Sequence, residues 1–171
     1  SPGLKVGYSV LPQALRGPVL HEKGNHDFGS ANFNQHLLAA LMESGRYAEH
    51  VTKLCGVYRS KLAATLQALD REFLRHAIPA HWTRPDGGLY VWVALPKEID
   101  TTREGELFRR CLAKEVLYVP GEYCFPPDWD SSEAGPLGGP NHTMRLSFGV
   151  QSVAGLREGI ARLAAAVAEC M

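Results

Sequence analysis

Arg145 is the residue of this sequence whose setting points most directly to chemistry. Apolar and polar residues alternate along positions 143 to 149, where Arg145 and Ser147 alternate with Met144 and Leu146. Successive side chains of a β-strand point to opposite faces, so the pattern predicts a strand with one apolar and one polar face. A guanidinium in the middle of such a strand is costly to remove from water unless an anionic group meets it.

Two interpretations of this strand are open from its residues. In the first, it is an edge strand whose polar face lies in water, as is common in antiparallel sheets. In the second, Arg145 is held rigidly over a cleft, where its planar set of N–H donors suits a carboxylate. The choice between them depends on the rest of the chain.

Three other groups of residues have types that could do chemistry, but their spacing argues against each. His21, His26 and Asp27 fit no common zinc pattern, so we expect no metal site. Residues 86–88 (Asp-Gly-Gly) form a turn that no helix follows directly, unlike a phosphate-binding loop. Cys124 has no predicted base beside it, and we expect an inert thiol.

The composition is that of an ordinary soluble domain. Among 171 residues, 45% are hydrophobic and 21% are charged, with 18 basic and 18 acidic side chains. The balance of charge and the lack of a basic block give no electrostatic footprint for nucleic-acid binding. No apolar run approaches the roughly 18 residues that a membrane span needs. The four widely spaced cysteines favour free thiols in a reducing cytosol, so we expect a cytoplasmic protein.

The elements that must position Arg145 follow from hydrophobic periodicity. Helical spacing is weak over residues 13–23 and clear over 31–44, and it predicts one long amphipathic helix over 47–74. Thr101 and Glu104 have the spacing of a capping box, which predicts a further helix there. Ser152 is expected to cap a last helix that runs to the end of the chain.

Strand patterns alternate with these helices. Period-two segments predict strands over 4–11, 80–83, 89–95, 116–119 and 143–149. The turn at 85–88 predicts a hairpin, and 89–95, apolar on both faces, predicts a central strand covered on each side. A strand, helix and strand in succession suggest a right-handed crossover and a partly parallel sheet. Residues 120–140 are irregular, and irregular segments of that length tend to be functional lids or disordered.

Four motifs, read together, carry a family resemblance. The first runs from Ser1 to Tyr8 (SPGLKVGY) and is similar to the Pro-Gly-Leu-Arg-x-Gly-Tyr segment of pyridoxal-phosphate-dependent aminotransferases of fold type I, class I/II. Residues 84–93 (RPDGGLYVWV) resemble the family's Pro-x-Gly-Gly-x-Phe-x-Trp hairpin. Residues 119–125 (VPGEYCF) resemble its Val-x-Pro-Gly-x-x-Phe segment. Residues 144–148 (MRLSF) resemble its Arg-Leu-x-Phe strand. The four occur in the family's order over nearly the whole chain.

The resemblance implies an α/β fold and a division of the chain. Residues 1–45 would be the tail of the large cofactor-binding domain. Residues 46–171 would be the small C-terminal domain, a mixed sheet packed with helices, including a long inter-domain helix. The parent protein would be a cytoplasmic homodimer that transfers an amino group between an L-amino acid and a 2-oxo acid through pyridoxal phosphate.

The resemblance also implies roles for two residues. Arg145 would bind the α-carboxylate of the substrate. Lys5 stands where the family usually has an arginine that contacts the cofactor phosphate, and an ammonium neutralises phosphate as a point charge. The family's Schiff-base lysine would lie just ahead of Ser1, so no catalytic residue is expected in this chain and the chain alone is expected to be inactive. Lys61, in the long helical pattern, is expected to be a solvated helix residue.

Two alternatives stay open. An aminotransferase-like effector domain of a transcriptional regulator would share these motifs and would follow a DNA-binding domain. A pyridoxal-phosphate enzyme of the same fold with lyase or synthase chemistry would share them as well.

Overall fold

The computed structural model describes residues 2–129 and 138–171, and the chain divides into two compact units within one long helix. The N-terminal unit covers residues 1–54 and the C-terminal unit covers residues 55–171. The helices are α1 (Gln13–Asp27), α2 (Asn32–Glu43), α3 (Arg46–Arg75), α4 (Glu106–Ala113) and α5 (Val153–Ala168). The strands are β1 (His81–Trp82), β2 (Tyr90–Ala94), β3 (Val119–Pro120) and β4 (Thr143–Ser147). Short 3₁₀ turns are η1 (Pro2–Leu4), η2 (Gly121–Cys124) and η4 (Pro140–His142).

The N-terminal unit has no core of its own among its described residues. None of residues 3–54 is buried. Apolar side chains such as Tyr8, Phe28 and Phe33 are between 76% and 94% exposed. Exposure of this kind means that most of the hydrophobic stabilisation available to these helices is not realised within the unit.

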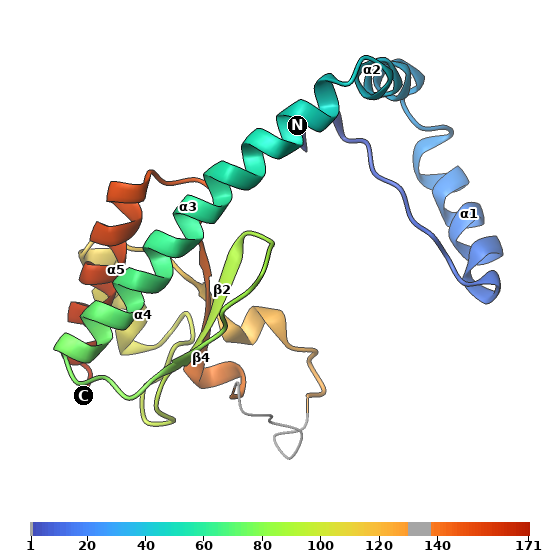
Figure 1. Ribbon diagram of the computed structural model, residues 1–171. Coiled ribbons are helices and arrows are strands. Elements are labelled where there is room, and N and C mark those ends of the chain that lie inside the picture. Colours follow the sequence, from blue (N-terminus) through green and yellow to red (C-terminus); the bar gives the residue numbers. More distant parts are fainter. Residues whose placement is uncertain (1, 130–137) are drawn as a thin grey trace. The chain divides into compact units, whose positions relative to one another are not determined.

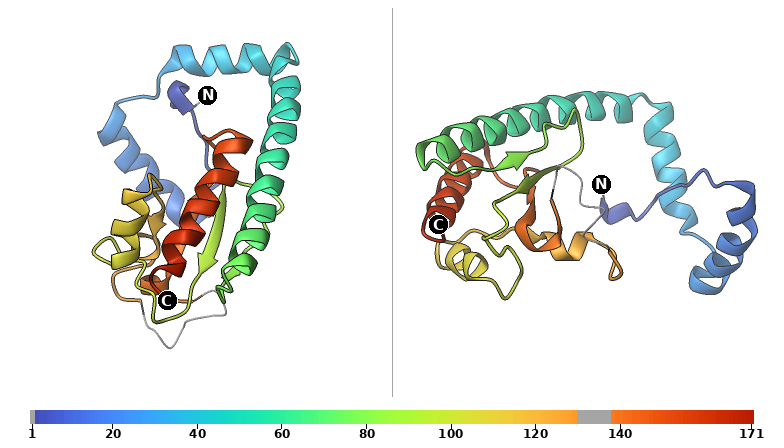
Figure 2. Two further views of the ribbon diagram at one scale, coloured as in Figure 1. Left: turned by 90° about the vertical axis from the view of Figure 1, so that its left-hand side faces the viewer. Right: turned by 90° about the horizontal axis from the view of Figure 1, so that it is seen from below.

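The C-terminal unit is a four-stranded sheet with helices on one face (Figure 1). The strand order is β1-β2-β4-β3, and β4 pairs antiparallel with β2 on one side and β3 on the other. Figure 2 shows α5 lying beside the C-terminal part of α3. The core forms between these helices and the sheet, and its fully buried members include Leu69, Phe73, Val91, Met144 and Leu163.

Most of the helix predictions are confirmed. The expected long helix is α3, which continues through Gly56 without a break. The last helix begins after Ser152, whose side chain accepts a hydrogen bond from the backbone N–H of Gly155 at 3.1 Å. The helix expected from Thr101 begins instead at Glu106, because Thr101 is buried and its hydroxyl donates to the carbonyl of Thr143. The weak helical pattern over residues 13–23 corresponds to α1, which continues four residues further, to Asp27.

The strand predictions are corrected at two places. The strand expected over 4–11 is absent; after η1 the described backbone is irregular, and Lys5 has a φ of 53°, which breaks an extended chain. The prediction of a partly parallel sheet is also wrong, because every described strand pair is antiparallel. Strands β2 and β3 run in the same direction, as the crossover predicted, but β4 lies between them.

The hairpin expected at 85–88 is confirmed, since β1 and β2 pair antiparallel across it. Strand β2 is central, as predicted, but among the described residues helices cover only one of its faces. Val91 and Val93 are fully buried, whereas Tyr90 on the other face is 46% exposed. Of the long irregular segment expected over 120–140, residues 130–137 lie outside the described part of the chain.

Candidate active site

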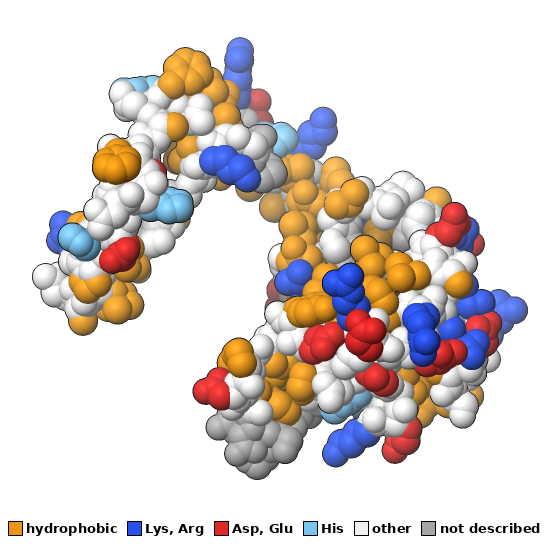
Figure 3. Space-filling view, turned by 180° about the vertical axis from the view of Figure 1, so that it is seen from behind, with side chains coloured by type: hydrophobic (Ala, Val, Ile, Leu, Met, Phe, Trp, Pro, Cys, Tyr) orange, Lys and Arg blue, Asp and Glu red, His pale blue; other side chains and the backbone are white. Residues whose placement is uncertain are grey.

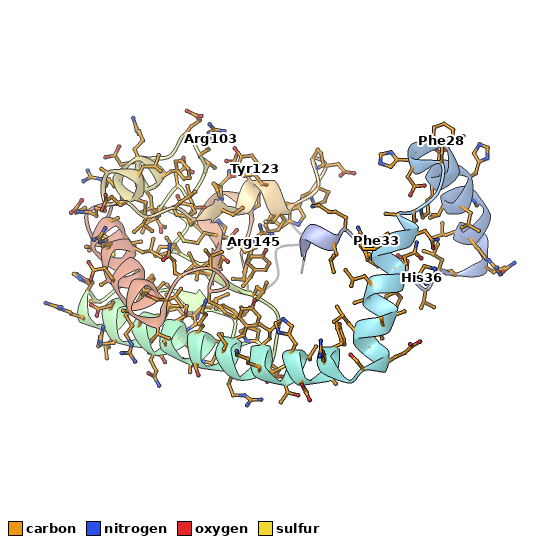
Figure 4. All side chains as sticks on the ribbon, turned by 90° about the horizontal axis from the view of Figure 1, so that it is seen from above. Phe28, Phe33, His36, Arg103, Tyr123 and Arg145 are labelled. Carbon is orange, nitrogen blue, oxygen red and sulfur yellow. The ribbon has the colours of Figure 1, made fainter. Side chains whose placement is uncertain are left out.

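Arg145 lies on an inner strand of the sheet. Its direct partners across the sheet are Trp92 on β2 and Val119 on β3. Met144 and Leu146 point to the helix-covered core, so the side chain of Arg145 projects from the opposite face (Figure 4). The edge-strand interpretation is therefore wrong, because β4 has a neighbour on each side.

The guanidinium of Arg145 has an aromatic neighbour and no carboxylate partner among the described residues. Its Cζ lies 4.3 Å from the centroid of the Tyr90 ring. Its Nε is buried and makes no hydrogen bond within residues 2–129 and 138–171. Several other arginines of this unit are ion-paired; for example, Arg109 contacts Glu106 at 3.0 Å, and Arg162 contacts Glu115 at 2.8 Å.

This arrangement suits an anionic ligand with two oxygens. A buried donor without an acceptor costs roughly 1–3 kcal/mol, and a carboxylate would remove that cost. A guanidinium is planar and binds a carboxylate through two parallel N–H···O bonds. The face of the sheet that carries Arg145 is therefore a candidate substrate-binding surface.

Aromatic rings continue this surface beyond Arg145. The Trp92 and Phe125 ring centroids are 5.8 Å apart, and those of Phe125 and Trp129 are 4.9 Å apart in an edge-to-face arrangement. The separations are those of favourable aromatic pairs. Sequence reasoning identified Trp92 and Phe125 only as parts of motifs and missed Trp129.

A buried hydrogen-bond network fixes the start of β4. The hydroxyl of Thr143 donates to the carbonyl of Gly139 at 2.8 Å, and that of Thr101 donates to the carbonyl of Thr143 at 2.7 Å. The Tyr118 hydroxyl donates to the carbonyl of Thr101 at 3.0 Å. Burial raises the pKa of Tyr118, so it remains a donor at neutral pH. The network sets the position of the backbone that leads into Arg145.

The turn η2 lies directly against this network. The labels in Figure 4 mark Tyr123, on η2, and Arg103. The backbone N–H of Arg103 donates a hydrogen bond to the carboxylate of Glu122, also on η2, at 2.8 Å. This contact ties η2 to the segment that leads into α4. The motif residue Phe125, at the end of η2, is held in this way beside Trp92.

Lys5 lies in the N-terminal unit and is exposed. The carbonyl of the preceding residue, Leu4, accepts a hydrogen bond from the side-chain amide of Asn34 at 2.9 Å, which fastens the segment to α2. Lys5 and Arg145 thus belong to different units.

Two other lysines have structural partners. The ammonium of Lys61 donates to the carbonyl of Gly149 at 2.8 Å, so the expectation of a solvated helix residue is wrong. It binds the loop that follows β4, a contact that helical spacing alone does not indicate. Lys23 pairs with Asp27 one turn away, and that contact lowers the pKa of Asp27.

One cavity of the C-terminal unit lies apart from Arg145. This cavity, of about 430 Å³, is lined by Ser147, Gln151, Gly159 and Arg162, among others, but not by Arg145. Within the described ranges, no group of three or more His, Cys, Asp or Glu side chains is arranged to hold a metal ion. No described helix combines the length and apolar character of a membrane span.

Comparison with known proteins finds aminotransferases among the relatives of this chain. No family model matches the chain. The chain is 38% identical over 168 residues to a 2-aminoadipate transaminase from Thermus thermophilus, covering 98% of this chain and 38% of that protein. It is 31% identical to aromatic-amino-acid aminotransferase 1 from Thermococcus litoralis, covering 100% of this chain and 37% of that protein.

Comparison with solved structures also finds aminotransferases. The α-aminoadipate aminotransferase of Thermus thermophilus superimposes with a TM-score of 0.76 at 33% identity, over 99% of this chain and 39% of that one. The kynurenine aminotransferase of Pyrococcus horikoshii gives 0.79 at 28% identity, over 98% of this chain and 38% of that one. The two relatives and two solved structures named above are aminotransferases of fold type I, the pyridoxal-phosphate-dependent class, and the chain has their fold.

The chain spans less than two fifths of the length of the aminotransferases it matches. It is also similar to transcriptional regulators of the helix-turn-helix type. An uncharacterised one from Bacillus subtilis, YisV, is 28% identical over 160 residues, covering 94% of this chain and 29% of that protein.

Proposed function

We propose that this chain is the C-terminal part of an aminotransferase that moves an amino group between an L-amino acid and a 2-oxo acid. The observation that carries the proposal is Arg145, an inner-strand arginine with a buried, unbonded Nε and no acidic partner among the described residues. Its guanidinium binds the α-carboxylate of the substrate in two parallel hydrogen bonds. The aminotransferase relatives favour this class of reaction.

The chain's own residues orient the substrate. Pyridoxal phosphate, when bound, supplies the electron sink for the reaction. Arg145 fixes one end of the substrate, so that the reacting carbon of the substrate is held in one orientation. Less entropy is then lost when the bound substrate goes on to react. Lys5, exposed and cationic, neutralises the cofactor phosphate.

The organisation of the whole protein is part of the proposal. Residues 1–45 are the tail of a large cofactor-binding domain and residues 46–171 form the small domain. The apolar side chains exposed over the N-terminal unit support this, because they need a covering that the unit does not contain. The whole protein acts in the cytoplasm as a homodimer.

Replacing Arg145 in the full-length protein tests the assignment. Arg145→Ala should raise KM for the amino acid and for the oxo acid and lower kcat/KM by about 30-fold to several thousand-fold, while pyridoxal phosphate binds with unaltered absorbance. Arg145→Lys should recover part of the loss, because an ammonium lacks the paired donors. Arg109→Ala, which removes an exposed, ion-paired arginine, is the matched control. Unaltered kcat/KM in Arg145→Ala would refute the role of Arg145.

Lys5 has its own test. Lys5→Arg should retain or tighten the binding of pyridoxal phosphate to the full-length protein, and Lys5→Ala should loosen it. Equal dissociation constants for the three proteins would remove Lys5 from the site.

We propose that the 171-residue chain is inactive by itself. Lys61 binds backbone carbonyls and Lys23 pairs with Asp27, so neither presents a free amine. Borohydride reduction after incubation with pyridoxal phosphate should label no single lysine stoichiometrically. Quantitative labelling of Lys23 or Lys61 would contradict this.

A regulator is the second candidate, favoured by the similarity to helix-turn-helix proteins. Turnover of amino acids with 2-oxo acid acceptors by the full-length protein decides for the aminotransferase. The same assay distinguishes an aminotransferase from a lyase or synthase, which forms products without a 2-oxo acid acceptor. Operator binding without turnover decides for the regulator.

A further inference from the structure

Tyr90 and Arg145 meet diagonally across the two inner strands of the sheet. In the β2–β4 register Tyr90 is opposite Ser147, and Arg145 is opposite Trp92. Diagonal neighbours on one face of an antiparallel pair are within reach of long and aromatic side chains. The side chain of Arg145 therefore leans along the sheet, and its Cζ lies over the Tyr90 ring at 4.3 Å.

Among the described residues, the contact with the Tyr90 ring is the interaction that holds the guanidinium in place. The Nε of Arg145 has no hydrogen-bond partner, and no ion pair is made by Arg145 within the described ranges. A cation within about 6 Å of an aromatic centroid is attracted by the electrons of the ring. That attraction uses no hydrogen-bond acceptor, so it holds the guanidinium and leaves its N–H donors for a ligand.

We propose that Tyr90 is a positioning residue, which holds Arg145 ready for the substrate carboxylate. The proposal rests on the carboxylate role proposed above for Arg145. It assigns the effect to the face of the ring, because the Tyr90 hydroxyl has no hydrogen-bond partner among the described residues. Tyr90 is 46% exposed, so it is not needed to fill the core.

Substitutions at position 90 of the full-length protein test this. Tyr90→Leu should raise KM for amino acid and oxo acid by about 2- to 30-fold, the range expected for losing a cation–aromatic contact, with kcat much less changed. The same variant should weaken binding of an unreactive carboxylate such as hexanoate by a similar factor. Tyr90→Phe retains the ring face and should retain wild-type values.

Two side chains of matched shape at position 90 distinguish a loss of the ring contact from a folding defect. Phenylalanine and its pentafluoro derivative at position 90 have nearly the same shape, but fluorine withdraws electrons from the ring face. The fluorinated protein should fold normally and bind hexanoate more weakly than the phenylalanine protein. Equal affinities for the two would overturn the proposal.

A double-mutant cycle separates this inference from the proposed function. Tyr90→Leu should have no further effect in the Arg145→Ala background, because no guanidinium remains to be held. An equal effect of Tyr90→Leu in both backgrounds would overturn the role of Tyr90 and leave that of Arg145 intact. If Arg145→Ala alone has no effect, the proposed function fails, and the positioning role fails with it.

Discussion

A Cβ atom on Gly121 would lie 2.0 Å from the hydroxyl oxygen of Thr143 and 2.7 Å from its carbonyl oxygen. Gly121 is the glycine of the Val-Pro-Gly motif, and Thr143 begins the strand that carries Arg145. The motif glycine is therefore required by the close approach of η2 to β4. Glycine at this position lets one backbone lie against the other.

Gly121→Ala should destabilise the protein by about 1–3 kcal/mol or more, because the methyl group displaces Thr143 from its hydrogen bond to Gly139. Gly87→Ala is the matched control, since Gly87 has open space around it and no positive φ. Its effect should remain within about 0.5 kcal/mol. Urea unfolding measures both, and equal midpoints for the two variants would contradict the steric explanation.

Thr101→Val keeps the shape of the side chain and removes the hydroxyl that donates to the carbonyl of Thr143. Loss of a buried hydrogen bond should lower the free energy of unfolding by roughly 1–2 kcal/mol. Ser60→Ala removes an exposed hydroxyl bonded to its own helix and should have little effect. The difference between the two, measured by chemical unfolding, tests whether the network supports β4.

His142 gives a pH dependence of stability with a defined sign. Burial lowers the pKa of its imidazole below the ordinary 6.5, and Lys97 lowers it further while Glu98 opposes. Its Nε2 accepts a hydrogen bond from the backbone N–H of Gly139 at 3.1 Å, which requires the neutral ring. Protonation therefore favours the unfolded chain.

The contribution of His142 should be fully present above pH 6.5 and should be lost as the pH falls toward the lowered pKa of the folded state. The fall in unfolding free energy between pH 7.5 and pH 5 should be smaller in His142→Asn than in the wild type. An NMR titration that places the pKa of His142 above 6.5 would show the sign to be wrong.

The thiols should react in an order set by burial. All four cysteines are free, and Cys55 and Cys124 are exposed. Burial raises the pKa of Cys111 to about 12, so its reactive thiolate is scarce at neutral pH. Cys55 and Cys124 should react first with a disulfide reagent, and Cys111 only on unfolding. Mass mapping of the modified peptides gives the order, and early labelling of Cys111 would contradict its burial.

The charged surface of the C-terminal unit bears on the regulator alternative. On the face shown in Figure 3, basic and acidic side chains of this unit alternate and do not gather by sign. Several of them are paired, including Arg110 and Lys114 with Glu169 at 3.0 and 2.8 Å. The face shown therefore offers no basic patch of the kind that binds DNA.

The sequence by itself determined the features that depend on local geometry. Helical spacing located α3, the type and position of Ser152 located the start of α5, and alternation assigned Arg145 and Met144 to opposite faces of β4. The four motifs also carried the resemblance to aminotransferases. These inferences succeed because a helix or strand imposes its period on nearby residues.

The tertiary structure decided what depends on residues far apart in the chain. It placed β4 inside the sheet and bound Lys61 to the loop at Gly149. The segment after Leu4 pairs with no strand among the described residues. The tertiary structure also brought the Tyr90 ring under Arg145. Alternation fixes which face a side chain occupies, but strand order and register arise from packing and loop closure between distant segments, so the neighbours of Arg145 emerge only in the folded sheet.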